Sequence, residues 1–287
     1  MHQMKVYSII VLLFTASCML FAQEKRALVV GIGQYEDPSW GRINADKDLE
    51  YVGKILDMYG FEDVVYLRNE TATKAAIVEA FVNITERSDA GDVVYVHFSG
   101  HGQQMKDLDG DEDDGCDESW IPYDAYRKCG KNDDGSKHLS DDEINVMLLR
   151  LRSKVGADGH ILVVADACHS GESSRSAEHV EDGYVRRGVN DVFVPSYESK
   201  HSVVVEEDWL LISACEDYQV NFEVQKPRVG KLTYCLYKLR KDLPKMSNEG
   251  LMAKLYELME SSEMISPLPQ NPHLDGGKYR AKDVFKK

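Results

Sequence analysis

Residues 93–102 read Val-Val-Tyr-Val-His-Phe-Ser-Gly-His-Gly, and residues 161–171 read Ile-Leu-Val-Val-Ala-Asp-Ala-Cys-His-Ser-Gly. Each stretch is a short apolar run, rich in β-branched residues, that ends in small and polar residues. Continuous apolar runs of this length are typical of strands buried on both faces of a parallel sheet. Sites in such sheets lie beyond the carboxyl ends of the strands, where His101 and Cys168 fall. If the two strands are neighbours, an imidazole and a thiol meet there, as nucleophilic catalysis requires.

The rest of the chain alternates between apolar strand patterns and amphipathic helix patterns. Ser140 and Glu143 form a capping box at the start of one of these helices. The alternation predicts a three-layer α/β/α fold with a mostly parallel central sheet. Further strands are predicted at residues 26–32, 64–67 and 209–214, helices at 45–59, 71–84, 140–151, 232–239 and 250–259, and a loop at 267–277.

Length and composition bound the possible functions. The chain has 287 residues, a 43% hydrophobic fraction and a formal net charge of -15. The hydrophobic fraction is ample for a core, and no linker divides residues 23–287 into two domains. The acidic surplus argues against a nucleic-acid partner, because a phosphate backbone would be repelled.

The N-terminal segment reads as a secretory signal peptide spanning residues 1–22. Lys5 supplies its positive end, residues 6–13 supply a short apolar core, and cleavage is expected after Ala22. The mature protein is then expected to be secreted or periplasmic. A membrane anchor is disfavoured because the apolar stretch is short. Lipoprotein attachment at Cys18 is disfavoured because Thr15 stands where Leu is usual.

Removal of this segment leaves five cysteines, an odd number that suggests a reactive thiol in an oxidising compartment. Cys116 and Cys129 share a polar loop and could form a disulfide. Cys215 and Cys235 lie in or beside apolar runs and are predicted to be buried thiols. Cys168 is therefore predicted to be the functional thiol.

Two segments read as insertions in the domain. Residues 107–118 are crowded with carboxylates, so they form either a solvated acidic loop or a cation site. Residues 172–206 are polar and charged, and Arg175, Arg186 and Arg187 are predicted to be exposed. Connections of this length are usually functional or disordered.

Four motifs together resemble those of the caspase-like cysteine peptidases, and within them the metacaspases. The likeness extends over roughly residues 25–275. The glutamine-alanine-cysteine-arginine-glycine type of signature of true caspases is absent, so cleavage after aspartate is not implied. The motifs are Ser-Gly-His-Gly at 99–102, Asp-Ala-Cys-His-Ser-Gly at 166–171, Ser-Ala-Cys with spaced Gln and Glu at 213–223, and the helix start at 230–237.

The resemblance implies a catalytic dyad of His101 and Cys168, with no third orienting residue. The oxyanion donors are then the backbone amides of Cys168 and Gly102. No cofactor is needed for this chemistry.

The resemblance also implies an acidic substrate pocket built from Asp48 and Asp166, with Ser99 in its lining. Two carboxylates in a partly desolvated pocket favour Arg or Lys at the residue before the scissile bond, P1. For Asp48, which lies in the first turn of a predicted helix, helix capping is an open alternative.

Some metacaspases need Ca²⁺, and in this chain Asp117, Glu118 and Asp124 lie in the corresponding region. A later acidic position expected near Arg175 is not acidic. With a basic P1 preference, the basic residues of 172–206 are either self-cleavage sites or part of a solvated loop.

The leading hypothesis is a monomeric cysteine endopeptidase that acts on proteins or peptides after Arg or Lys, with cleavage of its own chain left open. One alternative is a non-catalytic caspase-like module that binds a partner in the same cleft. Another is a legumain-like thiol hydrolase with asparagine specificity, against which the acidic pocket argues, because Asn needs no counter-charge.

Overall fold

The computed structural model describes residues 23–108, 110, 112, 114–168, 183–189, 191–197, 208–216, 218–276 and 278–286. The predicted signal peptide, the His-Ser-Gly end of the cysteine motif and Arg175 lie outside these ranges. Within them, no helix is long and apolar enough to cross a membrane.

The central element is a six-stranded sheet with the strand order β11-β8-β7-β3-β1-β2. All its strands run parallel except β11, which pairs antiparallel with β8 at one edge. The sheet is thus mostly parallel, as the sequence predicts. Its strands are β1 (Lys25–Gly31), β2 (Asp63–Arg68), β3 (Val93–Ser99), β7 (His160–Asp166), β8 (Leu210–Ser213) and β11 (His273–Asp275).

The two strands that precede the candidate catalytic residues are neighbours. Every residue of β3 is buried, and β7 is buried from Ile161 onward. In the parallel register, Ser99 lies opposite Asp166 at the carboxyl ends of the two strands. The chain therefore carries His101 and Cys168 out of the sheet at adjacent points, as the sequence predicts.

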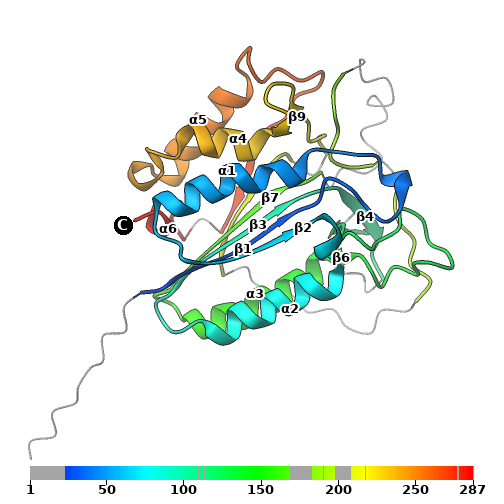
Figure 1. Cartoon of the computed structure of the whole chain (residues 1–287), viewed down its shortest axis with the longest axis horizontal. Coiled ribbons are helices and arrows are strands. Elements are labelled where there is room, and N and C mark those ends of the chain that lie inside the picture. The colour runs from blue at the N-terminus through cyan, green and yellow to red at the C-terminus, as the bar shows by residue number, and fades with distance from the viewer. Residues whose placement is uncertain are drawn as a thin grey trace, which may run out of the picture.

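Helices cover both faces of the sheet and complete three layers (Figure 1). One face packs against α1, α4, α5 and α6 through a core that includes Leu49, Tyr95 and Leu236. The other packs against α2 and α3 through a core that includes Phe81 and Leu148. The helices are α1 (Ala45–Met58), α2 (Lys74–Arg87), α3 (Asp141–Val155), α4 (Lys231–Leu239), α5 (Asn248–Met259) and α6 (Ala281–Val284), with short 3₁₀ helices at Pro38–Trp40, Asn69–Thr71 and Leu243–Lys245.

Local sequence signals explain the starts of the two helices on the second face. Ser140 accepts a hydrogen bond from the Glu143 amide, and the Glu143 carboxylate accepts one from the Ser140 amide, which is the predicted capping box. Thr73 caps α2 by accepting from the Ala76 amide. Such caps satisfy backbone donors that the helix itself leaves unpaired.

Smaller elements depart from the sequence prediction. The predicted acidic insertion ends in a strand that starts at Cys116, and the predicted loop at 267–277 contains β11, an edge strand of only three residues. Cys116 and Cys129 are free thiols, so the possible disulfide between them is not formed. The remaining strands are β4 (Gly102–Lys106), β5 (Cys116–Trp120) and β6 (Leu139–Ser140) in one small sheet, and β9 (Glu223–Val224) with β10 (Val229–Gly230) in another.

Candidate active site

His101 is held in one tautomer at the end of β3. Its Nε2 lies 3.1 Å from the carbonyl oxygen of Gly41, to which it donates. Its Nδ1 is buried and hydrogen-bonds to no residue that the structure describes. The ring stacks on Trp40, with 5.3 Å between ring centroids. Since Nε2 carries the proton, Nδ1 presents a lone pair, and a backbone carbonyl orients this base.

In the intact chain, burial and the positive charge of Arg187 both disfavour the imidazolium and lower the pKa of His101 to about 4. The ring should therefore stay neutral until the pH falls to that value. An unfolded imidazole titrates near 6.5. The buried neutral ring therefore contributes stability that is present above that pH and is lost as the pH falls toward 4. NMR titration of an uncleaved Cys168→Ala chain measures this pKa.

His273 is the internal control for that titration. Although partial burial opposes it, Asp275 and Glu216 raise the pKa of His273 above its usual value. As the pH falls, His273 should gain its proton first and His101 much later. Equal titration of the two rings would contradict the neutral, buried state of His101.

Cys168 lies two residues beyond the end of β7, with 1% of its surface exposed. Its thiol donates to the Gln219 carbonyl oxygen, at 3.5 Å. Its backbone N–H donates to the carbonyl oxygen of Arg187 over 2.9 Å, and the Gly102 N–H reaches the same oxygen over 3.3 Å. These are the two amides expected to form an oxyanion hole, and both point at one peptide carbonyl.

Asp48 is fully buried beneath this point, on the first turn of α1. Its carboxylate accepts hydrogen bonds from Ser99 Oγ (2.8 Å) and from the Gly230 amide (2.9 Å). Burial raises the pKa of Asp48 to about 6, although the charge of Arg187 opposes this shift. The alternative that Asp48 caps its helix is wrong, because Asn44 holds the N-cap position and the hydrogen bonds of Asp48 go to groups outside α1.

Asp166 is also fully buried and, like Asp48, lies beside the guanidinium of Arg187. Its carboxylate accepts from Asn221 Nδ2 at 2.8 Å and from both the amide (2.8 Å) and the hydroxyl (2.7 Å) of Thr233. Although burial alone disfavours ionisation, the Arg187 guanidinium and these hydrogen bonds hold the pKa of Asp166 below its usual value. Three donors thus fix a charged carboxylate two residues before Cys168.

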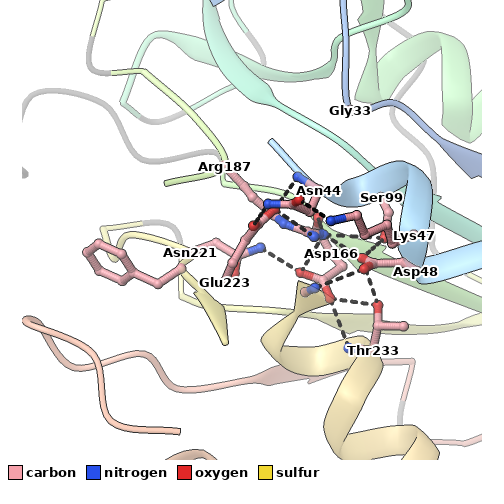
Figure 2. A network of polar contacts seen from close by, with 12 residues as sticks. Gly33, Asn44, Lys47, Asp48, Ser99, Asp166, Arg187, Asn221, Glu223 and Thr233 are labelled. Carbon is pink, nitrogen blue, oxygen red and sulfur yellow. Dashed lines mark hydrogen bonds and ion pairs between the residues drawn. The ribbon is translucent and has the colours of Figure 1, made fainter. Parts of the chain in front are cut away.

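Arg187 fills the space between these two carboxylates (Figure 2). The sequence prediction that it is exposed is wrong: none of its surface is accessible. Its Nη1 lies 2.7 Å from Asp48 Oδ2 and 3.4 Å from Asp166 Oδ1. Opposing the cost of burial, the surrounding carboxylates raise the pKa of Arg187 above its usual value, so it remains charged.

The backbone around Arg187 pairs with the walls of the site as an added strand would. Its N–H donates to the Asn221 carbonyl, and the Glu223 N–H donates to the Val185 carbonyl. On its other side, Gly188 bridges to Gly102. A β-carbon on Gly188 would lie 3.0 Å from Cys168 Sγ, so the residue after Arg187 packs against the thiol. Extended peptides bind many proteins in this way, by adding a strand to an exposed edge.

Sequence reasoning assigned no role to Glu223 or to the Gly41 carbonyl. Glu223 lies in the Ser-Ala-Cys block with its spaced glutamate, which was the only signal that could have found it. Its Oε1 is 3.1 Å from Arg187 Nη2, and its two carboxylate oxygens accept from the Asn44 amide and side chain, each at 2.6 Å. It is therefore a third carboxylate around the guanidinium of Arg187.

The predicted calcium ligands are not gathered in one place. Asp117 and Glu118 are consecutive in β5, so their side chains leave opposite faces of the strand. Asp124 accepts from the Lys74 amide at the start of α2. Across the described part of the chain, no group of three or more His, Cys, Asp or Glu side chains is arranged to hold a metal ion. These residues do not fit a shared Ca²⁺ site in this structure.

Residues 24–278 match the model of the caspase domain family. This chain belongs to that family, and its sequence is similar to those of metacaspases. Metacaspase-1B of Aspergillus fumigatus is 36% identical over 159 residues, covering 51% of this chain and 35% of that protein. Metacaspase-1 of Cryptococcus neoformans is 33% identical over 157 residues, covering 52% and 32%. The matched stretches thus span about a third of each relative's length.

Solved structures agree on the fold. A crystal structure of a protein from Geobacter sulfurreducens superposes with a TM-score of 0.64 at 24% identity, covering 88% of this chain and 92% of that one. Caspase-1 from Spodoptera frugiperda superposes with a TM-score of 0.57 at 14% identity, covering 88% and 86%. Both similarities support the three-layer caspase-like architecture.

Proposed function

We propose that this chain is an endopeptidase that cleaves after basic residues through Cys168 and His101, and that it cuts its own chain after Arg187. One observation carries the proposal: Arg187 lies as a substrate arginine would. Its guanidinium occupies the acidic pocket while its carbonyl oxygen accepts from the amides of Cys168 and Gly102. One residue thus has its side chain bound by the carboxylates and its carbonyl bound by the two amides that would activate it.

The reaction follows from these positions. Transfer of the thiol proton to Nδ1 of His101 leaves a thiolate at Cys168, which attacks the carbonyl carbon of Arg187. The negative charge on the carbonyl oxygen is stabilised by the two amides. His101 returns the proton to the amide nitrogen of Gly188, which leaves as an amine, and Arg187 remains as a thioester on Cys168. Water then hydrolyses the thioester, giving the Arg187 carboxylate and restoring the thiol.

The same geometry makes the intact chain a proenzyme. The guanidinium of Arg187 is buried between the carboxylates that would bind a substrate arginine, so such an arginine can enter only after Arg187 has left. Cleavage between Arg187 and Gly188 creates two chain ends and releases the constraint that holds the residue there. Activity on added peptides should therefore increase as the uncut chain disappears.

Hydrolysis of fluorogenic peptides with Arg, Lys, Asn or Asp at P1 tests this function. The full chain should cleave the Arg and Lys peptides, after a lag that matches its own cleavage. Turnover of the Asn peptide alone would favour the legumain-like alternative and overturn the pocket assignment. Absence of both self-cleavage and peptide turnover in the folded protein would favour the binding-module alternative. Peptides and proteins with basic P1 residues are the expected substrates.

Calcium activation and export remain predictions. The proton transfers above use only Cys168 and His101, so the proposed chemistry needs no metal. Running the same assay with Ca²⁺ and with a chelator measures whether Ca²⁺ activates the protein.

Secretion or export to the periplasm predicts a mature N-terminus at Gln23, which mass spectrometry of the exported protein measures.

A further inference from the structure

The two ends of the buried guanidinium are bound by carboxylates on opposite walls of the pocket. Nη1 of Arg187 contacts Asp48 on α1 at 2.7 Å, and Nη2 contacts Glu223 on β9 at 3.1 Å. Both side chains are almost entirely buried: none of the Asp48 side chain and 2% of the Glu223 side chain are exposed. The fork of the guanidinium therefore spans the pocket and is held at both tips (Figure 2).

Glu223 is held in place by groups other than the arginine. Asn44, which precedes α1, donates to one of its oxygens from its amide and to the other from its side chain. The Glu223 amide is fixed as well, because it donates to the Val185 carbonyl. Because both carboxylate oxygens are already bonded, the side chain keeps its position when the P1 residue changes, and such preorganised groups discriminate sharply between ligands.

We infer, on the basis of the proposed function, that Glu223 is a specificity-determining residue that makes the pocket select arginine over lysine at P1. An ammonium is a compact charge on one nitrogen, whereas a guanidinium presents a rigid fork of donors. An ammonium at the place of Nη1 keeps the contacts with Asp48, Ser99 and the Asp166 carbonyl. It cannot also reach Glu223, so a bound lysine leaves a buried carboxylate without its cation, which is costly. The substrates of this pocket are therefore arginine peptides.

The first test compares two peptides that differ only in Arg or Lys at P1, using self-cleaved wild-type protein and a Glu223→Gln variant. Removing one charge-assisted hydrogen bond should lower kcat/KM for the Arg peptide about 10- to 100-fold. The value for the Lys peptide should change only a few-fold, so the preference for arginine collapses. Glu216→Gln is the matched control: Glu216 lies on the same segment, pairs with His273 and makes no contact with Arg187, and it should leave the ratio unchanged. Equal loss for both peptides, or no loss, would overturn the role of Glu223.

The second test needs no catalysis, so it separates this inference from the proposed function. In a Cys168→Ala chain that stays uncut, Arg187→Lys should lower Tm by about 4 °C or more, because Glu223 loses its partner. In the same chain carrying Glu223→Gln, Arg187→Lys should lower Tm much less. Equal Tm shifts in the two chains would show that Glu223 does not discriminate between the guanidinium, with its second nitrogen Nη2, and an ammonium.

Together the two tests distinguish failure of the proposed function from failure of the role of Glu223. If the wild type cleaves neither peptide, the proposed function fails, and the Tm comparison still decides how Glu223 binds the guanidinium. If Glu223→Gln does not fold, Arg187→Lys alone decides: a Tm unchanged from that of the Cys168→Ala parent would overturn the inference.

Discussion

Replacing Cys168 by alanine should abolish both cleavage of the chain and hydrolysis of arginine peptides. The expected loss is at least about 10⁴-fold in kcat, because the proposed reaction passes through a thioester on the sulfur that this substitution removes. The variant should fold, since a single sulfur atom is removed from a small side chain. Gel analysis of the purified chain and a fluorogenic peptide assay measure the two effects.

Cys129→Ala is the matched control for that experiment, because Cys129 is an exposed free thiol outside the site. It should process itself and hydrolyse peptides at the wild-type rate. Residual peptide turnover by Cys168→Ala within about tenfold of wild type would assign the nucleophile to another residue.

Asp166→Asn should lower kcat/KM for arginine peptides about 10²- to 10³-fold. Losing one partner of a buried, hydrogen-bonded charge pair costs several kcal/mol, and Asp166 faces the guanidinium position at 3.4 Å. The asparagine side chain also cannot accept from both Asn221 and Thr233, whose hydrogen bonds fix this wall. Steady-state kinetics on the processed protein measure the loss, and alkylation of Cys168 reports whether the nucleophile remains reactive.

Asp158→Asn is the control for that variant, since Asp158 is exposed in the turn before β7. It removes the same charge from the other end of the same strand and should leave kcat/KM unchanged. An Asp166→Asn protein with wild-type kinetics would mean that the acidic pocket does not bind the P1 side chain.

Much of the site can be predicted from the sequence because its chemistry follows two buried strands. Continuous β-branched runs predict parallel neighbours, and the residues just past their ends, His101 and Cys168, must then emerge at one edge of the sheet. Asp48 and Ser99 were found through motif resemblance, and in the structure the Ser99 hydroxyl donates to the Asp48 carboxylate. These inferences depend on local residue patterns or on the order of motifs, and both can be seen in a single sequence.

Arg187 could not be predicted in this way, and the only signal for Glu223 was its place in the Ser-Ala-Cys block. An arginine in a polar segment has the same local pattern whether it faces solvent or an ion cluster. Its burial depends on carboxylates from α1, β7 and β9, which are far apart in the sequence and meet only in the folded chain. The Gly41 carbonyl that orients His101 is a backbone atom, so no residue type marks it. The edge strand β11 is too short to show the alternation that identifies a strand.

The central claim is that Cys168 and His101 act on a basic residue seated in the acidic pocket, and Arg187 is the residue seated there in the intact chain. N-terminal sequencing of the fragments of the purified wild-type protein, beside Cys168→Ala, tests it most directly. We expect a new N-terminus reading Gly188-Val189-Asn190 in the wild type and an uncut chain in the variant. A wild-type protein that hydrolyses arginine peptides at full rate while its Arg187–Gly188 bond stays intact would contradict it.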